Sequence, residues 1–183
     1  MENFLFSLIL FWRNNISLNI LIDGYNVIGI LHGSLEQKRN DFIDTLIEYN
    51  QIRHHNITCV FDGWKSSFGQ SSTIIGGIDV IYTGPGDKAD DLIKRIIKAK
   101  DKVWTVISSD REIVNSTWIY DSISITSSQF EQRLFQALSN QGKTDNDFDD
   151  DEEDDFQRYN QNKGNPKMLS KKERLIRKTI EKL

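Results

Sequence analysis

Five short runs of β-branched and other apolar residues recur along the first 126 residues of the chain. They are "LNILI" (18–22), "ITCVF" (57–61), "IDVIY" (78–82), "VWTVI" (103–107) and "SISIT" (122–126). Nearly continuous apolar runs of this length are typical of strands in a sheet that is buried on both faces. The pattern therefore predicts at least five strands of one buried sheet.

Amphipathic helical patterns separate these runs. One helix is predicted after Ser34, which can form a capping box with Gln37. Further helices are predicted over 86–100, 111–120 and 128–138, where apolar residues recur at intervals of three and four. Strands that alternate with helices imply right-handed crossovers, so we expect an α/β fold with a mainly parallel sheet and helices on both of its faces.

Residues 63–77, "GWKSSFGQSSTIIGG", are rich in Gly and Ser and are interpreted as a flexible loop. A loop of this length in a compact domain is often functional. Trp64 and Phe68 could stack on an unpaired base, but packing within the loop is an equally good interpretation of these two rings.

The end of the chain has a different composition. The stretch "DNDFDDDEEDD" (145–155) has nine acids and no base, whereas residues 163–183 have eight bases and two acids. Such acidic stretches bury too little apolar area to order themselves. The predicted organisation is a domain over 18–139, an acidic flexible linker over 140–162 and a basic tail over 163–183 that can form an amphipathic helix.

Cys59 is the sole cysteine, so the chain has no intramolecular disulfide and no thiol cluster for zinc. This usage fits a reducing, cytoplasmic setting. The apolar start "MENFLFSLILFW" lacks a basic leader and a cleavage site, and it is too short to span a bilayer. We interpret it as an extra packed element or the product of an upstream start codon, and we expect no membrane association.

Aspartates follow three of the five predicted strands. Asp23 follows the first directly, Asp62 follows the second directly, and Asp110 follows the fourth after two serines. Parallel strands present their carboxyl ends at one edge of a sheet, where ligands gather. We therefore expect these three carboxylates to approach one another, although a single aspartate at a strand end is more often a turn or cap residue.

A fourth acid is expected from "GDKADD" at the start of the 86–100 helix. At about 100° per residue, Asp90 flanks the apolar stripe that faces the sheet, whereas Asp91 points toward solvent. Asp87 is interpreted as the N-cap of the helix and Asp91 as a first-turn acid that the helix dipole favours.

Clustered carboxylates repel one another, and hard divalent cations such as Mg²⁺ and Mn²⁺ relieve that repulsion through oxygen ligands. Such an ion can lower the pKa of a bound water and align it with a phosphodiester. Asn26, three residues after Asp23, could orient a carboxylate or phosphate without adding charge. This chemistry needs no histidine.

Four sequence blocks resemble those of NYN-domain ribonucleases in the PIN-like superfamily, and in particular the bacterial YacP-like branch. They are "DGYN" after the first strand, "FDG" after the second, "KADDLIKR" at a helix start and "SSD" after a later strand. The branch has DGYNxIG, VFDG, TADxxI and TSD in the same order. The likeness covers about residues 18–139, and Lys88 departs from it because the branch more often has Thr before Ala-Asp.

This resemblance implies a PIN-like α/β/α fold and a metal-dependent endonuclease that hydrolyses RNA. By motif position, Asp23, Asp90 and Asp110 would bind Mg²⁺ or Mn²⁺, Asp62 would be a further acid of the site, and Asn26 its polar partner. The implied partner is RNA, including mRNA or ribosome-associated RNA. The oligomeric state is left open.

Other interpretations of the first block fail on its residues. The Gly-x4-Gly of a P-loop would need Lys and Ser or Thr where Ile30 and Leu31 stand, and a dinucleotide fingerprint is absent. A haloacid-dehalogenase-like phosphatase would need an aspartate at Tyr25, and a receiver domain would need adjacent acids near the first strand. The remaining alternative is a non-catalytic RNA- or ribosome-binding adaptor with the same fold, whose basic tail supplies the charge that RNA binding requires.

Overall fold

The computed structural model describes residues 17–29, 34–63, 69–140 and 170–183. The strands are β1 (Asn19–Asp23), β2 (Asn56–Phe61), β3 (Ser71–Ile75), β4 (Ile78–Tyr82), β5 (Thr105–Ile107) and β6 (Ile123–Ile125). The helices are α2 (Gly24–Ile28), α3 (Leu35–Arg53), α4 (Ala89–Lys98), α5 (Arg111–Ile119), α6 (Ser127–Ser139) and α7 (Lys171–Ile180). The apolar N-terminal run, Trp64, Phe68 and the acidic stretch 145–155 lie outside the described residues.

One six-stranded sheet in the order β3-β4-β2-β1-β5-β6 forms the centre of the domain. Strand β1 pairs in parallel with β2 on one side and with β5 on the other, while β2–β4 and β5–β6 are also parallel pairs. The chain builds the sheet outward from β1 in one direction and then in the other. The boundary between β1 and β5 is therefore the switch point at which open α/β sheets bind ligands.

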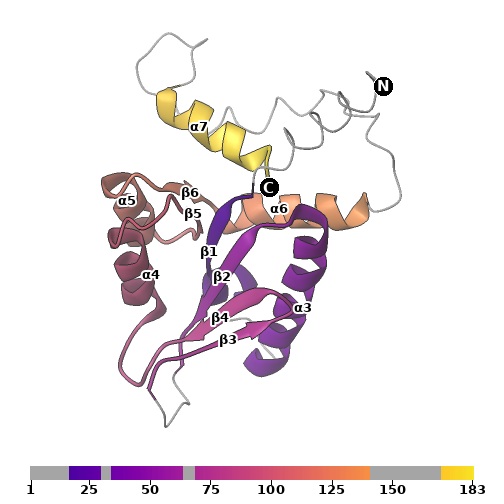
Figure 1. The fold of residues 1–183 in the computed structure, drawn as a ribbon, viewed down its shortest axis with the longest axis vertical. Helices are drawn as coiled ribbons and strands as arrows, with labels where there is room; N and C mark the ends of the chain where they lie inside the picture. Colours follow the sequence, from indigo (N-terminus) through magenta and orange to yellow (C-terminus); the bar gives the residue numbers. More distant parts are fainter. Residues whose placement is uncertain (1–16, 30–33, 64–68, 141–169) are drawn as a thin grey trace, which may run out of the picture.

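Helices cover both faces of this sheet, as the sequence predicts, because successive strand residues alternate between two apolar clusters. Ile20, Ile22 and Cys59 pack with α3 and α6, whereas Leu21 and Val60 pack with α4 and α5. Figure 1 shows α4 and α5 on one side of the sheet and α3 on the other. The predicted mainly parallel α/β/α fold is confirmed.

Strand β3 corrects the interpretation of residues 63–77 as a flexible loop. Residues Ser71–Ile75 form an antiparallel edge strand on β4, and every one of them is exposed. The turn between the two strands is Gly76–Gly77, and both glycines have positive φ angles of 55° and 86°. A two-residue Gly-Gly turn is a hairpin signal, but the polar, solvent-facing strand carries too little apolar pattern to be recognised.

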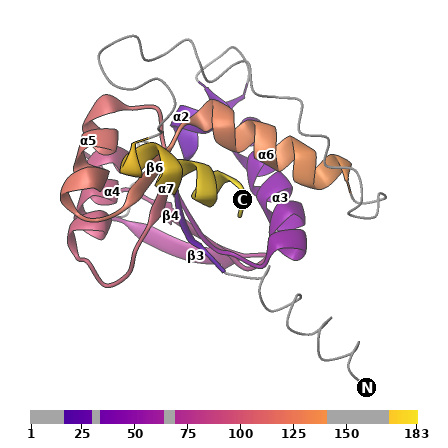
Figure 2. The same cartoon turned by 90° about the horizontal axis from the view of Figure 1, so that it is seen from above.

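Helix α7 packs beside β6 and α6 (Figure 2). Its N-terminus is closed by a capping box between Ser170 and Glu173. After the helix, the Leu183 side chain is fully buried in the same apolar cluster as α3 and α6. The hydroxyl of Tyr49 donates a hydrogen bond to the Leu183 carbonyl. The end of the described chain is thus part of the core.

Candidate active site

Asp23 lies at the carboxyl end of β1, at the centre of the sheet, and only 6% of it is exposed. One carboxylate oxygen accepts a hydrogen bond from the backbone N–H of Asn26 (3.4 Å), so Asp23 is the N-cap of the short helix α2. The other oxygen accepts from the hydroxyl of Ser108 (3.1 Å), which follows β5. The two strands at the switch point thus share this carboxylate.

Burial raises the pKa of Asp23 to about 6 from an ordinary value of 3.8. The hydrogen bond from Ser108 opposes that shift, while the nearby charges of Asp90 and Asp62 increase it. A carboxylate that is hard to ionise where other acids surround it indicates a site that is short of positive charge.

Asn26 faces the protein scaffold with its side-chain oxygen. That oxygen accepts hydrogen bonds from the backbone N–H of Ser109 (2.8 Å) and from the hydroxyl of Ser127 (2.6 Å). Ser127 in turn begins α6, and its own N–H donates to the hydroxyl of Ser109 (3.2 Å). Asn26 therefore holds together the ends of β1 and β5 and the start of α6, which is a positioning role.

Asp62 directly follows β2, and its carboxylate accepts a hydrogen bond from the backbone N–H of Ala89 at 2.6 Å. Ala89 is the first residue of α4, so Asp62 satisfies the start of a helix 27 residues further along the chain. The prediction that Asp87 caps this helix is wrong. The residue at the N-cap is Lys88, which makes no side-chain capping bond, and Asp87 instead forms an ion pair with Arg95 (3.4 Å).

Asp90, the second residue of α4, is half-buried, while its neighbour Asp91 is exposed. The helical wheel predicted this difference. Partial burial, and then the charge of Asp110, raise the pKa of Asp90, and the ammonium group of Lys94 opposes the shift. Lys94 itself is engaged by Glu112 at 2.7 Å, so it does not neutralise the acids alone.

Asp110 is the N-cap of α5. One of its carboxylate oxygens accepts hydrogen bonds from the backbone N–H groups of Glu112 (2.7 Å) and Ile113 (3.3 Å). Its own N–H donates to the hydroxyl of Ser108 (3.1 Å), the same hydroxyl that donates to Asp23. Ser108 thus fixes the relative position of the two acids.

The four acids belong to one electrostatic group. The charge of Asp23 is coupled to those of Asp62 and Asp90, and the charge of Asp90 is coupled to those of Asp62 and Asp110. Among the residues that the structure describes, no three acidic, histidine or cysteine side chains are close enough to hold one metal ion between them. The ligand roles of Asp23, Asp90 and Asp110 therefore stay predictions.

The donor set nevertheless suits Mg²⁺ or Mn²⁺, because it consists of carboxylate oxygens around a buried acid whose pKa is raised. Mg²⁺ keeps several of its waters and is usually held through only one or two carboxylates, so a site for it does not require three converging acids. The fit is one of charge and of ligand type.

Gly24 has a packing role that the sequence did not indicate. It begins α2, and a Cβ atom at this position would lie 2.2 Å from the ring of Phe61 at the end of β2. The ring of Tyr25 meets the same Phe61 edge-on, with centroids 5.2 Å apart. Glycine is needed here because α2 approaches β2 closely. The parallel pairing of β1 with β2 is what brings Asp23 and Asp62 to one edge.

Two serines that were not predicted as site residues organise this edge. Ser108, which is 1% exposed, and Ser127 bridge the predicted site residues through their hydroxyl groups. Their position immediately after predicted strands, at the same edge as the aspartates, was the signal that could have indicated them.

No helix in the described ranges is both long and apolar enough to cross a membrane.

Comparison with known proteins shows which family the chain resembles. A family model described as the YacP-like NYN domain matches residues 20–182. A curated relative, the "Uncharacterized protein YacP" of Bacillus subtilis, is 26% identical over 95 residues. That match covers 48% of this chain and only 56% of the relative.

Two solved structures of Rae1 (YacP) from Bacillus subtilis have a similar fold. The crystal structure of a point mutant has a TM-score of 0.55 at 19% identity and covers 68% of this chain and 79% of its own. A second crystal structure has a TM-score of 0.53 at 20% identity and covers 66% and 75%. At this level of identity, the similarity shows a shared fold.

Proposed function

The chain belongs to the YacP-like NYN domain family, and from that premise we propose that it is a ribonuclease that cleaves RNA internally with the help of Mg²⁺ or Mn²⁺. One observation carries the proposal. Asp23, Asp62, Asp90 and Asp110 come from four separate segments, and their charges are coupled at the switch point of the sheet. A purely structural role would not require a buried acid at this edge whose pKa is raised by burial and then further by the charges of Asp90 and Asp62.

One or two of the carboxylates of Asp23, Asp90 and Asp110 would hold the cation, with waters as its other ligands, and the bound ion would supply neutralisation of phosphate charge and activation of water. Asp62 and Asp110 each have one carboxylate oxygen occupied by backbone N–H groups, and among the described residues no hydrogen bond involves the other oxygen. Capping therefore fixes each carboxylate while leaving an oxygen for a ligand. Ser108 and Asn26 keep the strand ends in register and do not themselves need to contact RNA.

The test is cleavage of a labelled single-stranded RNA by purified protein with Mg²⁺ or Mn²⁺, and again with a chelator. Asp110→Asn should lower the cleavage rate by about 100-fold or more, as removal of a charge-stabilising group typically does. Asparagine caps a helix as well as aspartate does, so α5 and the thermal stability should be preserved.

Asp90→Asn and Asp91→Asn form a matched pair, because the two acids are adjacent on α4 but only Asp90 faces the site. We expect a loss of about 100-fold or more for Asp90→Asn, and a rate within about twofold of the wild type for the exposed Asp91→Asn. Unchanged cleavage by Asp90→Asn and Asp110→Asn, or cleavage that survives chelation, would exclude the proposed site.

A second candidate function is a non-catalytic RNA-binding adaptor. It is favoured by the capping bonds of Asp23, Asp62 and Asp110, which give each aspartate a structural reason to stand where it does. RNA binding without metal-dependent cleavage in the same assay would support the adaptor.

A further inference from the structure

The segment 170–183 is strongly basic, and its charged side chains point to solvent. It carries six Lys or Arg residues against Glu173 and Glu181. All six bases are exposed: Lys171, Lys172, Arg174, Arg177, Lys178 and Lys182. The apolar face that anchors the segment consists of Ile176, Ile180 and Leu183.

Contacts with the domain hold this basic segment in a fixed position. His55, which is 6% exposed, accepts a hydrogen bond from the N–H of Leu18 through Nδ1 (3.4 Å). Its Nε2 must then carry the proton, and it lies 3.1 Å from the carbonyl of Lys182. Together with the bond from Tyr49 to Leu183, this pairing attaches residues 182–183, which follow α7, to α3 and to the loop between α3 and β2. The bases are presented by a docked helix and not by a loose tail.

Most of these bases make no ion pair within the described part of the chain. Arg177 pairs with Glu181 (3.5 Å), and the Lys172 ammonium lies 4.0 Å from the centre of the Trp118 ring. Within the described ranges, Lys178 and Lys182 have no acidic partner. Their charges are therefore available to a ligand.

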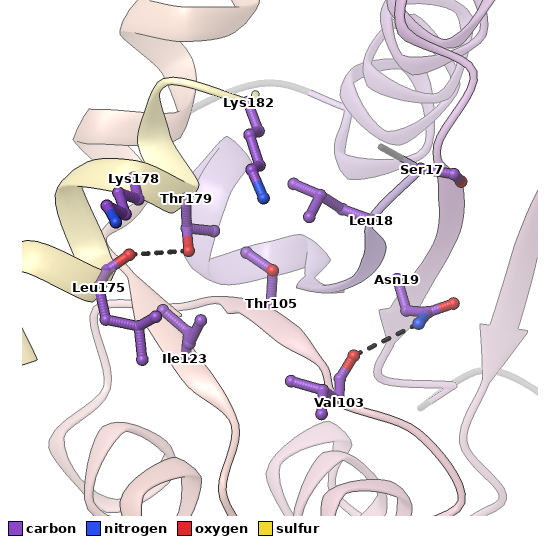
Figure 3. A pocket seen from close by; sticks show the side chains of 10 residues that line it. All are labelled: Ser17, Leu18, Asn19, Val103, Thr105, Ile123, Leu175, Lys178, Thr179 and Lys182. Carbon is purple, nitrogen blue, oxygen red and sulfur yellow. Dashed lines mark hydrogen bonds between the residues drawn. The ribbon is translucent and has the colours of Figure 1, made fainter. Parts of the chain in front are cut away.

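A pocket of about 300 Å³ lies between α7 and the amino-terminal ends of β1, β5 and β6. Lys178, Lys182 and Thr179 line it from the helix side, and Asn19 and Thr105 line it from the strands. Figure 3 shows the Lys182 side chain pointing into this space, toward Thr105. The Thr179 hydroxyl donates to the Leu175 carbonyl (2.9 Å) and the Asn19 amide donates to the Val103 carbonyl (3.3 Å). The groups suited to a phosphate are therefore the two ammonium groups and the Thr105 hydroxyl.

We propose that this surface, the basic face of α7 with the Lys178–Lys182 pocket, binds the phosphate backbone of the RNA at a distance from the cleavage site. The inference rests on the proposed function, since it assigns a second contact to the same substrate. A site of four acids repels phosphates, so an acidic nuclease of net charge −4 needs its affinity for RNA from elsewhere.

The geometry of β1 sets the separation of the two contacts. Asn19, at the start of the strand, lines the pocket, whereas Asp23, at its end, belongs to the acidic site. Four residue steps of a strand span about 13 Å. One RNA can contact the acidic site and the Lys178–Lys182 pocket together only by passing around the sheet. The α7 surface should therefore favour RNA of several nucleotides over shorter RNA.

The experiment measures RNA binding by the full chain in chelator, where cleavage cannot contribute. Lys178→Gln/Lys182→Gln is compared with Arg95→Gln/Lys98→Gln, a pair of exposed bases on α4 that removes the same charge. Each lost phosphate contact to single-stranded RNA lowers the slope of log affinity against log salt by about 0.7. We expect a slope smaller by about 1.4 and an affinity about 15-fold weaker at about 0.15 M salt for the α7 variant only.

A second measurement uses RNA of about 3 and about 30 nucleotides, lengths on either side of the usual binding-site size of about 4–16 nucleotides. The longer RNA should bind the wild type more tightly, and the α7 substitutions should remove most of that advantage. Equal losses in the α4 and α7 variants, or an unchanged salt slope, would overturn the proposal. Binding of polyglutamate as tightly as RNA would also overturn it, because the surface would then not be selective for nucleic acid.

These measurements separate the two proposals. RNA binding that depends on Lys178 and Lys182 without any cleavage would leave the α7 surface standing and remove the nuclease assignment. Metal-dependent cleavage with no effect of the α7 variant on binding would do the reverse.

Discussion

Asp23 combines three roles that one residue rarely has together. It ends the central strand, it caps α2 through one oxygen, and it receives the Ser108 hydroxyl on the other. These bonds stabilise an ionised carboxylate, yet burial still raises its pKa to about 6. Keeping this carboxylate ionised at neutral pH therefore lowers the stability of the folded protein. Such a cost is common for residues that serve function at the expense of stability.

We predict that Asp23→Asn stabilises the protein at pH 7.5 in chelator. The folded-state pKa is above the ordinary value, so the penalty exists above pH 6 and disappears as the pH falls toward 3.8. The shift sets an upper limit of about 3 kcal/mol for the gain. Urea denaturation at pH 7.5 and pH 4 checks this, with the exposed Asp91→Asn as control. A variant that is less stable than the wild type at pH 7.5 would contradict it.

The helices and strands were largely predictable because most of them carry a strong local signal. The five apolar runs all became strands, and Ser34 accepts from the N–H of Gln37 at the start of α3 as its sequence indicates. The hairpin strand β3 was wrongly predicted as loop because it is solvent-exposed along its whole length. The start of α4 was also predicted wrongly, since its cap comes from Asp62 on another element.

We predict that Gly77→Ala destabilises the β3–β4 hairpin. Gly77 has a φ of 86°, which an alanine rarely adopts, although an added Cβ atom would meet nothing nearer than the side-chain nitrogen of Asn50 at 4.0 Å. The cost should be about 1–2 kcal/mol and should come from backbone strain alone. Gly69→Ala is the control, because it has open space and no positive φ, so its stability should be unchanged or slightly raised. Urea denaturation measures both, and equal effects would contradict the explanation.

At the scale of the whole molecule, burial affects the stability of the two ends of the sheet with opposite dependence on pH. The pKa of Asp23 at one end is raised, and the pKa of His55 at the other end is lowered. Burial lowers the pKa of His55 to about 4 from an ordinary value of 6.5, mainly because the ring is desolvated. Protonation would also add a hydrogen to Nδ1, which accepts from Leu18. The docking of residues 182–183 therefore weakens on acidification. At the other end of the sheet, acidification protonates Asp23 and removes the cost of keeping that buried carboxylate ionised.

We predict that these two contributions partly cancel in the wild type between pH 6.5 and pH 4. In that window the unfolded state binds more protons at His55 than the folded state does. The contribution of His55 to the free energy of unfolding therefore decreases by up to about 3 kcal/mol as the pH is lowered. In His55→Gln, the opposite contributions of Asp23 and Asp90 remain, and the protein should gain stability relative to its own value at pH 7 as the pH falls. In Asp23→Asn, the free energy of unfolding should fall more steeply with decreasing pH than it does in the wild type. Parallel pH profiles of unfolding free energy for all three proteins would contradict this.

The sequence alone determined the α/β class, the parallel strands and the edge to which Asp23, Asp62 and Asp110 belong. Hydrophobic periodicity is a local property, and the alternation of strands with helices implies parallel pairing. The sequence also determined the orientation of Asp90, since one helix wheel suffices. Only the tertiary structure decided what each carboxylate contacts: that Asp62 caps α4, that Asn26 turns its oxygen to Ser109 and Ser127, and that the basic tail docks through His55 and Tyr49. Those contacts join residues from 27 to 134 positions apart, and no local pattern specifies which distant donor a side chain will meet.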